Sequence, residues 1–198
     1  MFDTHQIAPA HYPCGPNLPL SSEEVCPNIG WANVLPASNA TVDLTIGGDK
    51  LSFTGVGYHD QNWGVKPLTE AAKSWYWGHA QAGPYSVVWF DTIGNDGQEY
   101  VSGYVAWNGL LIQSSCEAGA VKVGPICGAY PPTQTDAVPE GYTLEYDLGM
   151  LGTLQFNVSV DLPLEDSPSY FRYMGKTLGG KIGEEVFEGK AVGEQLVN

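Results

Sequence analysis

Residues 75–115, WYWGHAQAGPYSVVWFDTIGNDGQEYVSGYVAWNGLLIQSS, decide the fold of this chain. Runs rich in aromatic and β-branched residues alternate there with the turn sequences Gly83-Pro84, Asn95-Asp96-Gly97 and Asn108-Gly109. Asn-Gly is a strong hairpin signal, because both central positions of a type I′ turn require positive φ. The stretch therefore predicts antiparallel strands over residues 75–80, 85–91, 98–107 and 110–114.

The same alternation continues on both sides of this stretch. We expect hairpins over residues 42–53, which end at Gly55-Val56-Gly57, over 142–148 with 153–160, and over 170–176 with 185–192. The one expected helix is short and covers residues 68–73 after Pro67. Many short strands separated by turns predict an all-β fold, an antiparallel sandwich or barrel.

The N-terminal part of the chain is rich in proline. Residues 1–40 contain Pro9, Pro13, Pro16, Pro19, Pro27 and Pro36. Because proline cannot donate a backbone hydrogen bond, we expect an extended lead-in here rather than a helix or a central strand. Residues 41–198 are expected to form one all-β domain.

The charge of the chain excludes several classes of partner. Lys and Arg number 8 and Asp and Glu number 22, which gives a net charge of −14. A phosphate-contacting nucleic-acid binder is excluded, because a polyanion would be repelled, and docking to anionic lipid is disfavoured. No apolar run approaches the roughly 20 residues of a membrane-spanning helix, so we expect no membrane insertion.

Four cysteines and two glycosylation sequons favour the secretory pathway. Cys14, Cys26, Cys116 and Cys127 allow three disulfide connectivities, of which the local pairs Cys14–Cys26 and Cys116–Cys127 are the simplest. The sequons begin at Asn39 and Asn157. The alternative is a cytoplasmic chain with free thiols and chance sequons, since N-x-S/T is a weak pattern.

Two segments concentrate polar and aromatic side chains. The first contains Tyr58, His59, Asp60, Asn62 and Trp63 within six positions. In the second, Trp75, Trp77 and His79 alternate and so face one side of a strand. They could line a ligand pocket, or the indoles could fill a barrel core. His59 and Asp60 could be an acid–base pair or a structural corner.

Common catalytic motifs are missing from the sequence. His59 and His79 match no zinc-binding spacing, and the chain has no G-x-S-x-G, G-x-G-x-x-G or Walker motif. The sequence therefore predicts a lined pocket without an evident nucleophile, metal or cofactor.

Several motifs resemble those of the fungal Diels–Alderase family, which is similar in turn to carotenoid 1,2-hydratase and AttH-like proteins. They are APAHYPCG (8–15), IGWANVLP (29–36), GVGYHDQNWG (55–64), SWYWGHA (74–80), GPYSVVWFD (83–91) and YFRYMGKTLGGKIGEEVFEGKAVGEQL (170–196). The resemblance implies two lipocalin-like β domains with the pocket between them. This chain then resembles the end of the first domain and the complete second one, and the other pocket wall would come from a missing N-terminal β domain or a homodimer partner.

The resemblance also implies an activity, a [4+2] cycloaddition, either Diels–Alder or hetero-Diels–Alder, on an apolar polyene, polyketide or terpenoid substrate. Such a reaction needs a shaped pocket more than proton transfer, because holding the reacting ends together lowers its barrier. No cofactor is implied. The residues expected to bind substrate are Trp31, Tyr58, Asn62, Trp63, Trp75, Trp77, His79, Trp107 and Tyr173. Lys176 is a candidate donor to a substrate carbonyl or enolate.

Two other functions remain open at this point. A hydratase or isomerase would use His59 and Asp60 as acid and base. Gln61 stands where the related signature often has a second histidine, which weakens a mechanism that needs two. The second alternative is a non-catalytic lipocalin-like carrier of an apolar ligand, because carriers and enzymes line their pockets with the same residue types.

Overall fold

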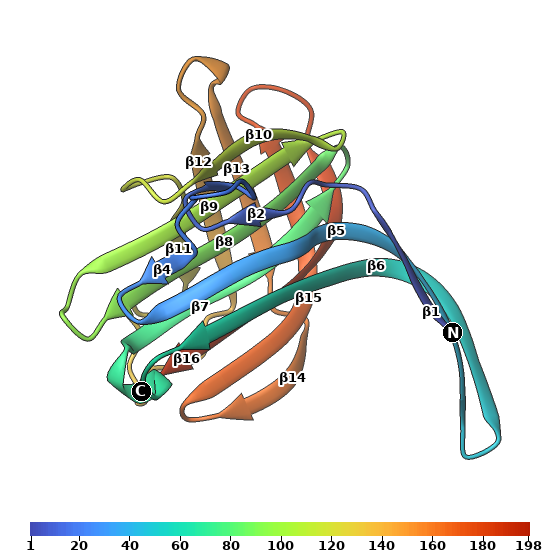
Figure 1. The fold of residues 1–198 in the computed structure, drawn as a ribbon, viewed down its shortest axis with the longest axis horizontal. Helices are drawn as coiled ribbons and strands as arrows, with labels where there is room; N and C mark the ends of the chain where they lie inside the picture. Colours follow the sequence, from blue (N-terminus) through green and yellow to red (C-terminus); the bar gives the residue numbers. More distant parts are fainter.

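The computed structural model describes residues 1–198 and consists of two antiparallel sheets (Figure 1). Sheet A contains β1 (Phe2–Gln6), β2 (His11–Tyr12), β3 (Gly15–Pro16), β4 (Glu24–Cys26), β5 (Ile29–Ile46) and β6 (Asp49–Gly64). Sheet B runs in the order β10 (Leu110–Ser115), β9 (Glu99–Trp107), β8 (Tyr85–Gly94), β7 (Ala72–Ala82), β16 (Phe187–Val197), β15 (Tyr170–Lys181), β13 (Thr153–Ser159), β12 (Gly141–Asp147) and β11 (Lys122–Ile126), and β14 (Leu162–Ser167) also pairs with β15. The predicted all-β class is confirmed.

Strand β5 is the centre of sheet A, which corrects the expectation of an extended lead-in without a central strand. β6 pairs along one edge of β5, and β1, β2 and β4 pair along the other. Pro36 is tolerated because it lies where the β5–β6 register shifts, between Leu35 and Ser38. The expected domain boundary at residue 40 falls inside this strand.

Two local expectations were also wrong. β6 does not end at Gly55-Val56-Gly57 but continues to Gly64, because Gly57 fits closely against Ser38 on the neighbouring strand. The expected helix is only the 3₁₀ turn η1 (Leu68–Glu70), since Ala72 already starts β7. The other helical segment, η2 (Gly149–Leu151), is equally short, and neither could cross a bilayer.

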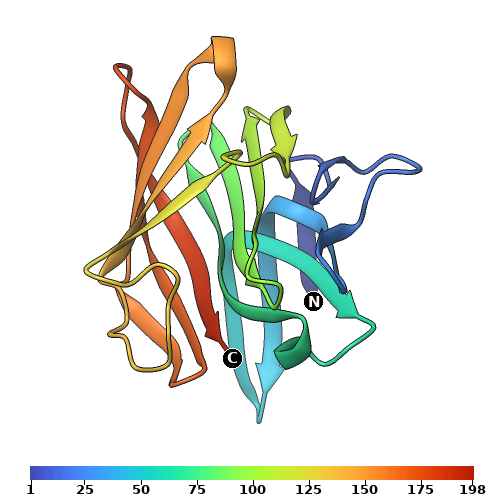
Figure 2. The same cartoon turned by 90° about the vertical axis from the view of Figure 1, so that its left-hand side faces the viewer.

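Sheet B is covered on both faces, and its residues alternate between two cores. Figure 2 shows the curled sheet B, green to red, with sheet A, blue to teal, against its outer side. Trp75 and Trp77 pack in the outer core with Trp31 of sheet A, whereas Tyr76 points into the inner core with Trp89. The expectation that Trp75 and Trp77 share a face is confirmed.

Glycines make room for the large aromatics of the inner core. Tyr173, Gly193, Gly78 and Trp89 are register partners across β15, β16, β7 and β8. A Cβ on Gly78 would lie 2.2 Å from the Trp89 ring, and one on Gly193 would lie 2.4 Å from the Tyr173 hydroxyl. The two rings therefore lie over strands that have no side chain at these positions.

The disulfide joins Cys14 to Cys116 and leaves Cys26 and Cys127 free, so the predicted local pairs were wrong. The turn that carries Cys14 lies on β9 and β10, where Ser102 Oγ donates to the Pro13 carbonyl at 2.7 Å. Cys26, by contrast, is buried in the outer core. Packing of the lead-in on sheet B, which loop length does not reveal, therefore decides the pairing.

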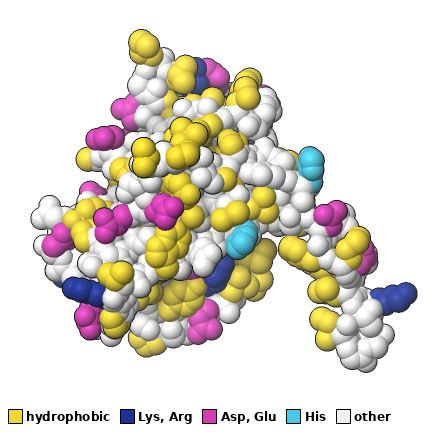
Figure 3. All heavy atoms as spheres, in the orientation of Figure 1, with side chains coloured by type: hydrophobic (Ala, Val, Ile, Leu, Met, Phe, Trp, Pro, Cys, Tyr) yellow, Lys and Arg dark blue, Asp and Glu magenta, His cyan; other side chains and the backbone are white.

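The tip of the β5–β6 hairpin projects from the body as an arm (Figure 1). Figure 3 shows hydrophobic side chains along the inner side of this arm. Leu44, Ile46, Leu51 and Phe53 are all exposed there. β5 and β6 therefore pack in the body of the molecule only over the parts of the strands away from the hairpin tip. These parts are β5 up to about Val42 and β6 from Gly57 onward.

We expect Gly78→Ala to lower the free energy of unfolding by about 1–3 kcal/mol, because the new Cβ would overlap the Trp89 ring in a close-packed core. Urea denaturation measures the change. Gly55→Ala is the matched control, because nothing lies within 4 Å of a Cβ at that strand position. Equal stabilities of the two variants would contradict the inner-core packing described above.

We expect two free thiols per chain in the unreduced protein. Cys127 is exposed and should react with iodoacetamide in the native state, whereas Cys26 is 2% exposed and should react only after unfolding. Burial also raises the pKa of the Cys26 thiol to about 12, which slows its reaction further. Mass spectrometry after alkylation counts the thiols, and either none or four would contradict the Cys14–Cys116 pairing.

Candidate functional site

A row of side chains crosses sheet B on the face that meets sheet A. Arg172, Glu194, Trp77 and Phe90 are successive register partners on β15, β16, β7 and β8. All four line a cavity of about 260 Å³, which is completed by Tyr170 and by two residues of β6, Asp60 and Asn62. The register of sheet B and the position of β6 thus create one site from two sheets.

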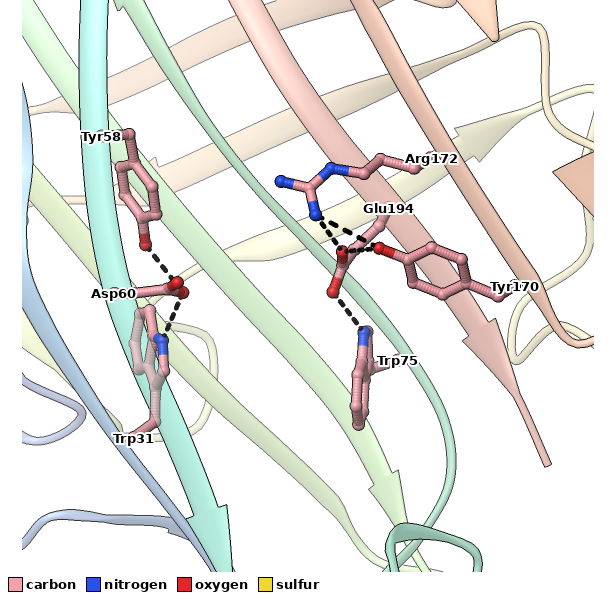
Figure 4. A network of polar contacts seen from close by, with 7 residues as sticks. All are labelled: Trp31, Tyr58, Asp60, Trp75, Tyr170, Arg172 and Glu194. Atoms are coloured by element: carbon pink, nitrogen blue, oxygen red, sulfur yellow. Dashed lines mark hydrogen bonds and ion pairs between the residues drawn. The ribbon is translucent and has the colours of Figure 1, made fainter. Parts of the chain in front are cut away.

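Glu194 is the centre of the polar contacts on the sheet B side (Figure 4). Trp75 Nε1 donates to Glu194 Oε1 at 3.2 Å, and the Tyr170 hydroxyl donates to Oε2. Arg172 Nη1 lies 3.6 Å from Oε2 and donates to the Tyr170 oxygen at 3.3 Å. The carboxyl group is therefore fixed from two sides, and its side chain is only 14% exposed.

Asp60 holds the corresponding place on the sheet A side. Trp31 Nε1 donates to Asp60 Oδ2 at 2.8 Å, and the Tyr58 hydroxyl donates to the same oxygen at 3.1 Å. Both donors belong to sheet A, Trp31 to β5 and Tyr58 to β6. Each carboxyl group at the cavity is thus positioned by an indole N–H and a phenol hydroxyl (Figure 4).

An aromatic stack adjoins the polar groups. The Tyr58 ring stacks on His79, with centroids 4.1 Å apart, and meets Trp77 edge-on at 5.2 Å. Burial, assisted by the nearby Arg172 charge, lowers the pKa of His79 to about 3, so its imidazole is neutral at physiological pH. Burial also raises the pKa of Tyr58 well above its usual value. The stack is therefore uncharged.

Burial raises the pKa of Glu194 above its usual value. The Asp60 charge raises it too, whereas the hydrogen bond from Tyr170, the Arg172 charge and the hydrogen bond from Trp75 oppose the shift. A carboxyl group with a raised pKa and a position at a cavity can hold and donate a proton. The site thus combines a carboxyl group of raised pKa with uncharged aromatic side chains packed beside it.

The structure brings most of the predicted site residues together. Asp60, Asn62 and Trp77 line the cavity itself. Trp31, Tyr58, Trp75 and His79 lie directly behind these residues, in hydrogen-bonding or stacking contact with the cavity groups. The two sequence segments singled out for their polar and aromatic content therefore meet at one place.

Other predicted residues lie elsewhere. His59 is exposed and alternates with Tyr58 and Asp60 along β6, and Lys176 is 69% exposed and pairs with Glu188. Tyr173 packs in the inner core, on the other face of sheet B. Trp63 lines a smaller neighbouring cavity of about 170 Å³, and Trp107 is half-exposed at the end of β9.

The predicted glycosylation sites are both on the surface. Asn39 and Asn157 lie in the strands β5 and β13, and both side chains are exposed. Glycosylation of either residue stays a prediction.

Sequence reasoning missed Tyr170, Arg172, Glu194 and Phe90. A signal was present, because Tyr170 and Arg172 alternate with Phe171 and Tyr173, and Glu194 directly follows the small and apolar run of residues 191–193. A charged residue next to such a run marks a position with special partners. The pairing of Arg172 with Glu194, however, depends on a strand register that the sequence does not state.

Comparisons with known proteins show which proteins this chain is similar to. The model of the Diels-Alderase-like family matches residues 3–123. The quinolone epoxide rearrangement protein penF of Penicillium thymicola is 40% identical over 192 residues, 96% of this chain and 53% of the relative. Its counterpart asqO of Emericella nidulans is 38% identical with the same coverage, and the Diels-Alderase poxQ of Penicillium oxalicum is 24% identical over 191 residues. The chain spans about half the length of these relatives.

Solved structures show the same fold. CghA, crystallised with Sch210972, superposes with a TM-score of 0.70 at 21% identity, over 94% of this chain and 58% of CghA. Kievitone hydratase from Nectria haematococca gives a TM-score of 0.60 at 16% identity, over 86% of this chain and 53% of the hydratase. These similarities bear out the predicted lipocalin-like fold and the family resemblance.

We expect Glu194 to make the stability of the protein depend on pH. Because its pKa is raised in the folded chain, the folded state binds this proton more tightly than the unfolded state does. The resulting stabilisation is complete below the usual pKa of 4.5 and is lost as the pH rises through the folded-state pKa. Gln cannot titrate. The free energy of unfolding of the wild type should therefore fall relative to that of Glu194→Gln as the pH rises.

Urea unfolding at several values from about pH 4 to about pH 8 measures this difference. Glu188→Gln is the matched control, because Glu188 lies on the same strand and is exposed. A wild-type advantage over Glu194→Gln that is constant with pH would show that Glu194 is not perturbed.

Proposed function

The chain belongs to the Diels-Alderase-like family, and from this premise we propose that it supplies the acid-bearing wall of an isomerase site for small secondary metabolites. The proposed reaction is the rearrangement of an epoxide. Two relatives with 38–40% identity are named for the rearrangement of a quinolone epoxide. The observation that carries the proposal is the largely buried Glu194 carboxyl at the cavity, with a raised pKa.

An epoxide rearrangement needs one proton and returns it. Glu194 donates its proton to the epoxide oxygen, one carbon–oxygen bond breaks, and the electron pair of that bond stays on oxygen. A neighbouring group then migrates with its bonding pair to the electron-deficient carbon, and a carbonyl forms as the proton returns to Glu194. The product is an isomer of the substrate, so no oxidant, reductant or water is consumed.

The surrounding residues position the acid for this chemistry. Tyr170 and Trp75 hold the Glu194 carboxyl in one orientation. This orientation lowers the entropy cost of reaching a reactive geometry with the substrate. Trp77 and Phe90 border the same cavity but are buried, so the groups that a ligand would meet there are mainly polar.

The experiment is to incubate the purified protein with a quinolone epoxide and to measure its isomer by liquid chromatography and mass spectrometry. We expect Glu194→Gln to lower the rate at least about 100-fold, the usual range for loss of a general acid. Glu188→Gln removes an exposed carboxylate from the same strand and should keep the wild-type rate. A wild-type rate and isomer ratio equal to those in buffer would overturn the proposal.

The [4+2] cycloaddition is the second candidate, favoured by the aromatic group of Tyr58, Trp77 and His79, of which Trp77 lines the cavity and the other two lie behind it. Diels-Alderase relatives with 24–25% identity also support it. The two reactions differ in their need for a proton. With a polyene substrate, a cycloaddition should survive Glu194→Gln and be lost in Trp77→Ala, whereas an acid-dependent rearrangement should be lost in Glu194→Gln.

A further inference from the structure

Arg172 uses little of its hydrogen-bonding capacity within the chain. A guanidinium carries five N–H donors in a planar fork that fits two acceptors at once. Only Nη1 has partners, the Tyr170 oxygen at 3.3 Å and Glu194 Oε2 at 3.6 Å, both of them long contacts. The remaining donors have no acceptor in the protein, and the side chain is 43% exposed.

The cavity itself makes Arg172 distinctive. Arg172 is the sole cationic side chain that lines the cavity. Two carboxyl groups, those of Asp60 and Glu194, line it as well. Its guanidinium lies over the Trp77 ring, with Cζ 5.8 Å from the centroid. A ligand that enters the cavity would therefore lie beside unused N–H donors of Arg172.

We propose that Arg172 is a specificity-determining residue that binds a carbonyl oxygen of the substrate and, in doing so, moves away from Glu194. The inference rests on the proposed function of Glu194 as the acid. A charge-assisted hydrogen bond of good geometry to the ligand replaces a long contact to the carboxyl group. The substrate class is thus a ring system with a carbonyl group next to the reacting centre.

The exchange couples substrate binding to the acid. The groups that face Glu194 are Tyr170 and Arg172 on β15, Trp75 and Trp77 on β7, and Asp60 on β6. Arg172 is the one cation among them and favours the charged carboxylate, whereas Asp60 favours the protonated acid. When Arg172 donates to a substrate carbonyl instead, its charge stabilises the Glu194 carboxylate less, and Glu194 binds its proton more tightly. Substrate binding therefore favours the protonated acid.

A matched pair of unreactive ligands tests the carbonyl contact. 3,4-Dihydroquinolin-2(1H)-one and 1,2,3,4-tetrahydroquinoline differ only by a carbonyl in place of a methylene group. Calorimetry should show that the wild-type protein prefers the carbonyl compound by about tenfold, as expected for one hydrogen bond to a charged group. Arg172→Met should abolish the preference, and Arg172→Lys, which keeps the charge but loses the fork, should reduce it.

Lys190→Met is the control, because it removes one positive charge from an exposed position of β16. It should keep the full preference. Equal affinity of the wild-type protein for the two ligands, or an unchanged preference in Arg172→Lys and Arg172→Met, would overturn the role of Arg172. The lysine variant keeps the test decisive if the methionine variant does not fold.

Proton uptake tests the coupling and needs no turnover. At pH values above the usual glutamate pKa of 4.5, the binding enthalpy of the carbonyl ligand in buffers of different ionisation heat should reveal proton uptake by the wild-type protein. Glu194→Gln should bind without uptake, and uptake that persists in this variant would contradict the coupling. Because these ligands do not react, a failure of epoxide rearrangement would leave the binding result unaffected, and the two hypotheses fail separately.

Discussion

The hydrogen bond from Trp31 to Asp60 joins the packing of the molecule to its site. Trp31 is buried between the two sheets. The centroid of its ring lies 5.3 Å from that of Phe90 and 5.4 Å from that of His11. Its N–H would have no water to bond there, and Asp60 accepts it at 2.8 Å. The side chain that fixes sheet A on sheet B thus also orients one of the two carboxyl groups at the cavity.

Charged groups survive at this interface because each one has defined partners. Removing a carboxylate from water is unfavourable unless hydrogen bonds or a counter-charge replace its hydration. Asp60 accepts two hydrogen bonds. Glu194 accepts hydrogen bonds from Trp75 and Tyr170 and lies near the Arg172 charge. The compensation at Glu194 is incomplete, which its raised pKa shows. An incompletely compensated carboxyl group at a cavity is suited to exchange a proton with a ligand.

Local sequence patterns predict the strands well, because turns such as Asn108-Gly109 and the alternation of residues 75–80 act over short distances. They also place Trp75, Trp77 and His79 on one face. The Cys14–Cys116 bond and the Arg172–Glu194 pair depend instead on contacts between segments far apart in the chain. The prediction of no central strand around Pro36 was wrong for a similar reason. A register shift in the β5–β6 pairing, which depends on the partner strand, makes a proline acceptable in a central strand.

Epoxide rearrangement and cycloaddition make different demands on one scaffold. Both need the substrate held in one geometry, and the cavity that Trp77 and Phe90 border is the proposed place for either reaction. Only the rearrangement needs a proton at a defined atom. On β16, Glu194 is the register partner of Trp77, so the acid stands beside this residue rather than at a distance from it. In the proposed function, a carboxyl group at this strand position therefore distinguishes acid-dependent rearrangement from cycloaddition in the same cavity.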